Sequence, residues 1–127
     1  MNELGTGDFN VTSCLFVNSK DVGFESIYVY YSSWPGSRRY SVTSSNFTQL
    51  QRPIFINDAS SIEFAMNRFY NNSCTLSSCQ SIAISFLRDF VFRGNVVEDN
   101  SASQILRINA TSGANSVPNI AIAGNIF

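Results

Sequence analysis

The chain has 127 residues, of which 44% are hydrophobic and only 13% charged, and its formal net charge is −1. A single domain with a hydrophobic core fits these values, whereas an intrinsically disordered chain and a nucleic-acid binder that works through a basic field are excluded. The sequence contains no histidine, which excludes Ser-His-Asp and Cys-His catalysis and any zinc site that uses histidine.

The first residues, 1–8, contain neither a basic segment nor an apolar run, so they do not predict a signal peptide. The signal of a secreted protein would therefore lie outside these residues. No run of 18 apolar residues occurs, so no membrane-spanning helix is expected. We treat residues 1–127 as one unit, with an irregular lead-in over 1–14 and repeats over 15–127.

An eight-residue pattern, apolar-x-apolar-x-x-Asn-x-apolar, recurs along the chain. A loose copy covers 15–22, and a copy at 40–47 has Ser45 in place of the asparagine. Full copies follow at 62–69, 90–97 and 120–127, with Asn67, Asn95 and Asn125 at the sixth position. Equivalent residues lie 22 to 30 positions apart, which is the mark of an internal repeat.

A second apolar pair recurs between these copies, at Ile27/Val29, Ile54/Ile56, Ile82/Ile84 and Leu106/Ile108. Both motifs alternate apolar residues with a period of two and are rich in β-branched and aromatic residues, which predicts strands. Two longer gaps, after Val29 and after Ile108, are rich in Gly, Pro and Ser and predict inserted loops.

Together these patterns predict an all-β solenoid with no major helix. We expect about four to five parallel coils of 22–30 residues, each with three short strands. The asparagine falls at the bend between the second and third strands. There it can adopt a left-handed backbone, and its amide can hydrogen-bond to the next coil. Asn67, Asn95 and Asn125 would then form a ladder.

This repeat resembles the right-handed parallel β-helix proteins of the pectate-lyase-like superfamily. The resemblance rests on the three copies that contain Asn67, Asn95 and Asn125, and it covers about residues 15–127. It implies a right-handed β-helix whose coils bury their apolar side chains against one another. The superfamily includes polysaccharide lyases, glycoside hydrolases, phage tailspikes, adhesins and extracellular proteins, so it specifies a fold rather than an activity.

Enzymes of this superfamily carry acidic residues on one outward face, and glycosidases need two carboxylates about 5–9 Å apart. Glu63 is the only acid at the outward positions of the second strand, where it could pair with Arg93 of the next coil. The catalytic candidates are therefore the acids of the turns, Asp58, Asp89, Glu98 and Asp99. Because no acidic column forms, the pattern favours a protein that is not an enzyme.

Glu98 and Asp99 could ligate calcium together with Asn100, or could belong to a solvated loop. We expect no other metal and no cofactor. Cys74 and Cys79 could form a disulfide or remain thiols. Four Asn-x-Ser/Thr sequences, at Asn10, Asn46, Asn71 and Asn109, permit glycosylation but do not indicate it, because the composition alone would give about three.

Aromatic and arginine side chains gather near the first strand and the first inserted loop. The candidate ligand-binding residues are Tyr28, Tyr30, Trp34, Arg38, Arg39 and Phe55, with Tyr31 and Tyr40 close by. Such residues stack on sugar rings and bond their hydroxyl groups. The alternative is an aromatic patch covered by another subunit or by more of a longer chain.

We therefore expect an extracellular or secreted scaffold, at a cell or virion surface, with a structural or adhesive role. Carbohydrate and other β-helix segments are the expected partners, and self-association through uncapped ends would give a filament. The alternative is a polysaccharide lyase or glycoside hydrolase, such as a tailspike-like depolymerase. Two aligned outward carboxylates would favour that enzyme.

Overall fold

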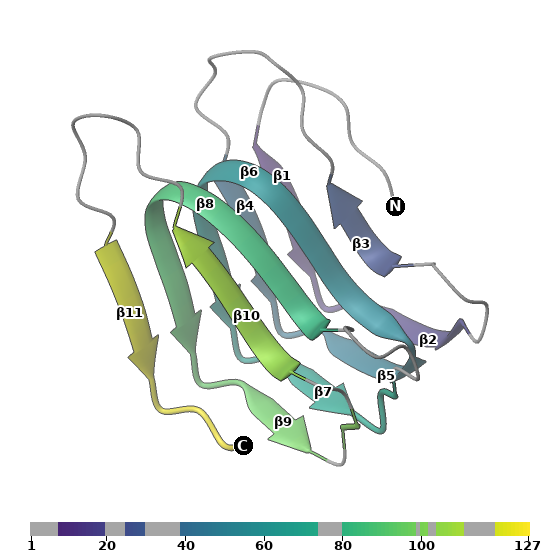
Figure 1. The fold of residues 1–127 in the computed structure, drawn as a ribbon. Helices are drawn as coiled ribbons and strands as arrows, with labels where there is room; N and C mark the ends of the chain where they lie inside the picture. Colours follow the sequence, from purple (N-terminus) through teal and green to yellow (C-terminus); the bar gives the residue numbers. More distant parts are fainter. Residues whose placement is uncertain are drawn as a thin grey trace.

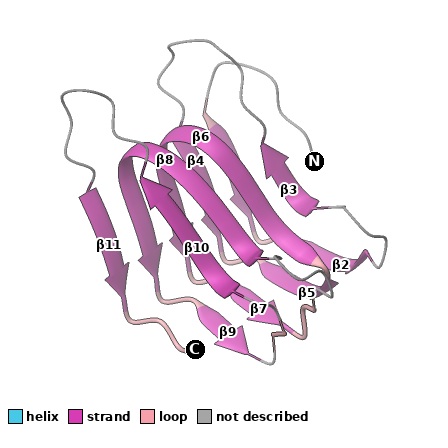
Figure 2. Ribbon diagram, viewed as in Figure 1, coloured by secondary structure: helices cyan, strands magenta, loops and turns pink. Residues whose placement is uncertain are grey.

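The computed structural model describes residues 8–19, 25–29, 39–73, 80–98, 100–101, 104–110 and 119–127. These residues contain eleven β-strands and no helix (Figure 2). The strands are β1 (Phe9–Thr12), β2 (Leu15–Ser19), β3 (Glu25–Val29), β4 (Arg39–Thr43), β5 (Asn46–Leu50), β6 (Arg52–Ala65), β7 (Arg68–Tyr70), β8 (Gln80–Arg93), β9 (Val96–Glu98), β10 (Gln104–Ala110) and β11 (Asn119–Ala123). The all-β prediction is confirmed for this part of the chain.

The strands form two parallel sheets. Seven strands make one sheet with the order β1-β4-β6-β8-β10, in which β3 also pairs with β6 and β11 with β8. The other sheet has the order β2-β5-β7-β9. Figure 1 shows that β6 and β8 bend strongly, so that the larger sheet forms two faces and the smaller sheet lies across their open side. The parallel pairing that the repeat predicts is confirmed.

Each strand pairs with its equivalent one repeat away. Phe64 lies between Val42 and Phe92 in the larger sheet, and Phe69 lies between Phe47 and Val97 in the smaller one. Because side chains alternate between the two sides of a strand, equivalent apolar residues stack in columns on the inner side. Residues at equivalent positions of the sequence repeat are therefore stacked on one another in the core.

The core lies between the three faces. Rings of Phe16, Phe47 and Phe69 stack with centroids 4.7 and 4.8 Å apart. Inward positions expected from the repeat and found buried are Ile27, Val42, Phe47, Ile54, Ile56, Ile62, Phe64, Phe69, Ile82, Ile84, Phe90, Phe92 and Val97. Each large apolar side chain contributes about 1.5–3 kcal/mol when fully buried, so these columns are the main source of stability.

The first repeat begins earlier than the sequence pattern indicated. β1 lies within residues 1–14, which we assigned to an irregular lead-in, and its Phe9 and Val11 pair with Tyr40 and Val42. The loose copy at 15–22 is therefore not a repeat unit. The true copy, 9–16, escaped notice because Cys14 occupies the asparagine position.

In two repeats the first and second strands are continuous. β6 and β8 have 14 residues each, and their pairing shifts register between Ile56 and Ala59 and again before Ser61. An irregularity of this kind increases the local bend, so it replaces the turn that we expected between short strands. Asp58 lies in this irregular part of β6.

The left-handed backbone belongs to the residue before the asparagine. The φ angles are 54° at Ser13, 51° at Ser44, 58° at Met66, 61° at Gly94 and 62° at Gly124. Each of these residues immediately precedes the asparagine position of its repeat. Our prediction that asparagine itself adopts this conformation was wrong, and hydrogen bonding explains its position instead.

Asn67, Asn95 and Asn125 are joined in an asparagine ladder. The backbone N–H and Nδ2 of Asn67 both donate to Oδ1 of Asn95, at 2.9 and 3.0 Å. Asn95 donates to Oδ1 of Asn125 in the same way, at 2.9 and 3.1 Å. The ladder continues to Ser45, whose backbone N–H donates to Oδ1 of Asn67 at 3.0 Å. These bonds satisfy polar groups that the turn would otherwise bury unpaired.

A second ladder lies five residues further along each repeat. The backbone N–H and Nδ2 of Asn72 donate to Oδ1 of Asn100, at 3.1 and 2.8 Å. Leu50 donates its backbone N–H to Oδ1 of Asn72 at 3.1 Å. Residues before two of these positions, Gln49 and Asn71, again have positive φ angles, 56° and 52°. Sequence analysis missed this ladder, although an asparagine occurs at the same offset in both repeats.

Candidate functional site

The outer face of β1, β4, β6 and β8 contains a groove of about 300 Å³. Its polar lining includes Asp8, Arg39, Ser61, Glu63 and Asp89, of which Asp8 immediately precedes β1 and the others belong to β4, β6 and β8. The volume is at the lower end of the range for ligand pockets. The groove is thus the place in the described residues where a catalytic candidate, a ligand candidate and further acids meet.

Asp89 is held by its equivalents in the neighbouring repeats. Oγ of Ser61 donates to Oδ2 of Asp89 at 2.9 Å, and Nδ2 of Asn119 donates to Oδ1 at 3.0 Å. The bond from Asn119, followed by the bond from Ser61, lowers the pKa of Asp89 below its ordinary value of 3.8, against a smaller opposing effect of desolvation. Asp89 is therefore ionised at neutral pH and is unsuited to the role of general acid.

Glu63 forms the cross-repeat ion pair that its column suggests. Nε and Nη2 of Arg93 lie 3.1 and 2.8 Å from Oε1 of Glu63. Both side chains are substantially exposed, 38% for Glu63 and 60% for Arg93. An exposed pair of this kind contributes at most about 1 kcal/mol, so its role is a modest link between repeats.

Glu63 and Asp89 come closer to an enzymatic arrangement than the sequence indicated. Ser61 pairs with Asp89, and Glu63 is two residues further along the same strand. Strand rise and strand spacing then place the two α-carbons about 8 Å apart. In inverting glycosidases the separation of about 6.5–9.5 Å is between the carboxyl groups rather than between the α-carbons. Both acids are, however, engaged with Arg93, Ser61 and Asn119.

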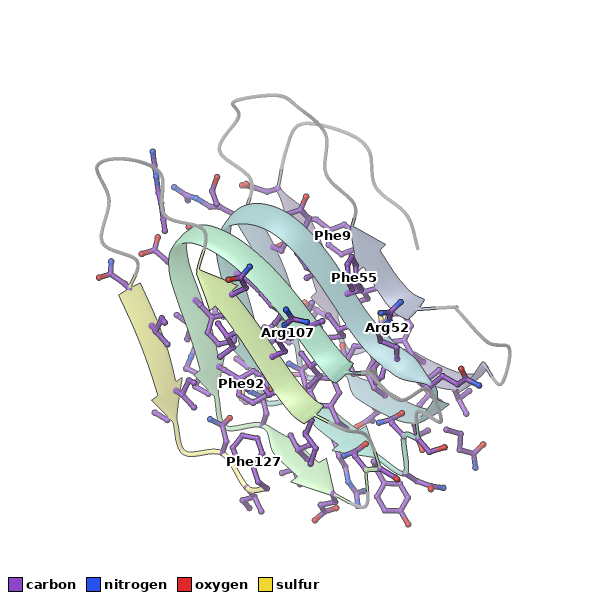
Figure 3. The ribbon with its side chains drawn as sticks, in the orientation of Figure 1. Phe9, Arg52, Phe55, Phe92, Arg107 and Phe127 are labelled. Carbon is purple, nitrogen blue, oxygen red and sulfur yellow. The ribbon has the colours of Figure 1, made fainter. Side chains whose placement is uncertain are left out.

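A separate patch lies on the face formed by β3, β6, β8 and β10. The guanidinium of Arg52 lies 5.0 Å from the centroid of the Phe55 ring. Ala83 follows Phe55 in the next strand, and Arg107 follows Ala83. Figure 3 shows Arg52, Phe55 and Arg107 on this one face. We call Arg52, Phe55 and Arg107 the arginine–phenylalanine patch; sequence analysis identified only Phe55.

The predicted ligand-binding residues do not form one cluster in the described part of the chain. Arg39 begins β4 and lines the groove, whereas Phe55 belongs to the arginine–phenylalanine patch, in the part of β6 that pairs with β3. Tyr28 pairs with Phe55 in the sheet register. Tyr40, expected outside, is buried and packs against Phe9. Residues outside the described ranges are Tyr30, Tyr31, Trp34 and Arg38.

Of the remaining candidates, those that the structure describes do not join the groove. Glu98, on β9, pairs with Arg68 at 2.9 Å. Asn100, the third expected calcium ligand, uses its side-chain oxygen in the second ladder, so that oxygen already accepts two hydrogen bonds. Asp99, Cys74 and Cys79 lie outside the described ranges.

Cys14 is an exposed free thiol. Within the ranges that the structure describes, no three His, Cys, Asp or Glu side chains are grouped as metal ligands.

No family model, curated protein or solved structure matches this chain. In the part of the chain that the structure describes, no helix is long and apolar enough to cross a membrane.

Proposed function

We propose that this chain forms a right-handed parallel β-helix that acts as an extracellular scaffold, with a structural or adhesive role and with carbohydrate as its ligand. The observation that carries the proposal is the pair of asparagine ladders. Their buried amides link successive repeats through side chains as well as through strands. Such cross-links make a stiff, extended framework from a short repeat, which is what a load-carrying or adhesive surface protein requires.

The state of the acids favours a scaffold over an enzyme. Asp89 accepts hydrogen bonds on both carboxylate oxygens, and Glu63 pairs with Arg93. A glycosidase of the inverting type needs one protonated acid and one free base. The lowered pKa of Asp89 opposes the first requirement, and the partners of both side chains oppose the second.

The arginine–phenylalanine patch is the surface that we assign to carbohydrate. The Phe55 ring is partly exposed at an outward position, Arg52 stacks on it, and Arg107 lies on the same face. An aromatic ring packs against the apolar face of a sugar, while guanidinium groups donate to hydroxyl or carboxylate oxygens. Regular spacing between strands would let successive sugar units contact successive repeats.

Binding to a panel of acidic and neutral polysaccharides tests this assignment. The chain is produced in bacteria, without glycans, and its retardation in affinity gels is measured. We expect Phe55→Ala to weaken binding about tenfold, in keeping with an aromatic contact of about 1.4 kcal/mol. Arg68→Ala is the matched control, because Arg68 also stacks on an aromatic ring, that of Tyr70, at 5.0 Å but lies on the other sheet. Equal binding by all three proteins would refute the assignment.

Self-association is a further part of the proposal. Ile120 and Ile122 continue the columns of Phe90 and Phe92, yet they are 53% and 48% exposed. A parallel strand of a second copy would cover them and extend the ladder beyond Asn125. Sedimentation velocity should then show a mass that rises with concentration. A monomer at every concentration would remove association from the proposal and leave the scaffold role unchanged.

The alternative is a polysaccharide lyase or glycoside hydrolase that acts in the groove. The observation in its favour is the approach of Glu63 and Asp89 across neighbouring repeats. Release of reducing ends from a polysaccharide, abolished in Asp89→Asn, would establish it.

A further inference from the structure

The asparagines whose side chains the structure describes fall into two groups according to what their amides do. One group hydrogen-bonds through the side chain and consists of Asn67, Asn72, Asn95, Asn100, Asn119 and Asn125. The other group consists of Asn10, Asn46, Asn71 and Asn109. None of these four side chains hydrogen-bonds to a residue that the structure describes, and all four are exposed.

The second group coincides with the Asn-x-Ser/Thr sequences. Five of the ten asparagines whose side-chain burial is described are exposed, and all four sequence matches are among those five. The number of matches, four, is close to what the composition gives, but their placement is selective. None of the buried asparagines, Asn67, Asn72 and Asn95, is the first residue of such a sequence.

The local geometry also suits the motif. Asn10 and Thr12 belong to β1, and Asn46 and Thr48 belong to β5. Residues two apart on a strand point to the same side, so each asparagine shares the outer side with its hydroxyl residue. Asn71 lies just after β7, and Ser73 beside it is also exposed.

We propose that Asn10, Asn46, Asn71 and Asn109 are N-glycosylation sites. This inference rests on the extracellular location in the proposed function. Nδ2 of the asparagine would attack C1 of an oligosaccharide carried on a lipid pyrophosphate. The N–C1 bond forms as the C1–O bond breaks, the amide loses one proton, and the lipid pyrophosphate leaves. No oxidant or reductant is needed.

The fold tolerates a glycan at these positions because no hydrogen bond to a described residue is lost. A glycan points to solvent from each exposed amide. A glycan on Asn10 stands beside the groove, since Asn10 lines it together with Glu63 and Asp89. The same modification of a ladder amide would remove donors that join two repeats.

The test directs the chain through the secretory pathway of a eukaryotic cell behind a cleavable leader. Chain from the cells and from the medium is treated with peptide N-glycosidase, which converts each glycosylated asparagine to aspartate, and the conversion is read by mass spectrometry. We expect conversion at all four sites. Thr48→Val should abolish it at Asn46 alone, and Thr48→Ser should preserve it. An unconverted asparagine overturns the assignment at that site.

A second measurement compares the melting of the glycosylated and enzymatically deglycosylated chains. We expect both to melt cooperatively at similar temperatures. Loss of the transition in the glycosylated chain would contradict the claim that these positions lie on the surface of the fold. Polysaccharide binding is measured on bacterial chain without N-glycans, so failure of the proposed function and failure of this inference are observed separately.

Discussion

Oδ1 of Asn95 accepts hydrogen bonds from two nitrogen atoms of Asn67, the backbone N at 2.9 Å and Nδ2 at 3.0 Å. Nδ2 of Asn95 donates in turn to the backbone oxygen of Phe64, at 3.0 Å. The buried amide of Asn95 therefore hydrogen-bonds to the backbone and the side chain of Asn67 and to the carbonyl of Phe64. This arrangement explains why the asparagine recurs while the loops between strands vary in length.

Asn95→Leu should destabilise the chain. The side chains are similar in size, but the backbone N–H of Asn67 and the carbonyl of Phe64 would lose their partner in a buried turn. We expect the free energy of unfolding to fall by about 1–3 kcal/mol, measured by chemical denaturation. Asn46→Leu is the control, because Asn46 is exposed, and it should change stability by less than about 0.5 kcal/mol. Equal effects would contradict the role of the ladder.

Met66→Gly should stabilise the chain. Met66 has a φ angle of 58° and is 62% exposed, while Gly94 and Gly124 occupy the equivalent position in later repeats. A left-handed backbone costs a residue with a β-carbon about 1 kcal/mol relative to glycine. We expect a gain of that size in the free energy of unfolding. The control is Arg68→Gly, which places glycine inside β7 and should destabilise. If Met66→Gly destabilises the chain, the claim that the backbone is strained at Met66 is refuted.

Asp89→Asn should reveal a pH-dependent contribution to stability. The bonds from Asn119 and Ser61 lower the pKa of Asp89 in the folded state, so the carboxylate stabilises the fold above its unfolded pKa. That contribution is lost as the pH falls from 3.8 through the folded pKa. The melting temperature of the parent chain should exceed that of the variant at pH 6, and the difference should shrink in acid. Ser61→Ala should reduce this difference in melting temperature. If the melting temperatures of the parent chain and of Asp89→Asn change with pH in parallel, the assignment is contradicted.

Glu63→Gln should have a small effect that depends on salt. The ion pair with Arg93 is close, at 2.8 Å, but largely exposed. We expect a loss of about 0.2–1 kcal/mol at low ionic strength that disappears in about 1 M salt, because counter-ions screen exposed charges. Chemical denaturation of the parent chain and of Glu63→Gln at two salt concentrations measures this loss in the free energy of unfolding. A loss that survives high salt would show that Glu63 supports the groove in another way.

The sequence predicts the parallel sheets and most of the core, because the period-two alternation and the repeat specify which residues face inward. It does not reveal β1, since Cys14 hides the asparagine position, nor the continuity of β6, since no local signal distinguishes an irregular strand from a turn. Leu50 similarly conceals the second ladder.

The groove escapes sequence analysis for a different reason. The sequence pattern predicts Asp89 in a turn, whereas it lies in β8 beside Ser61. Its approach to Glu63 depends on the exact register between β6 and β8, which the unequal repeat lengths obscure. Arg52 lies outside both repeat motifs, so its stacking on Phe55 depends on a contact that no pattern specifies.

The most direct test of the scaffold role measures the release of reducing ends from each polysaccharide of the panel, with and without calcium. The chain used is folded and is first shown to bind a polysaccharide. The scaffold role predicts retention of a polysaccharide that depends on Phe55, with no release of reducing ends by the parent chain. Release that is lost in Asp89→Asn or Glu63→Gln would contradict the scaffold role and would make the groove an active site.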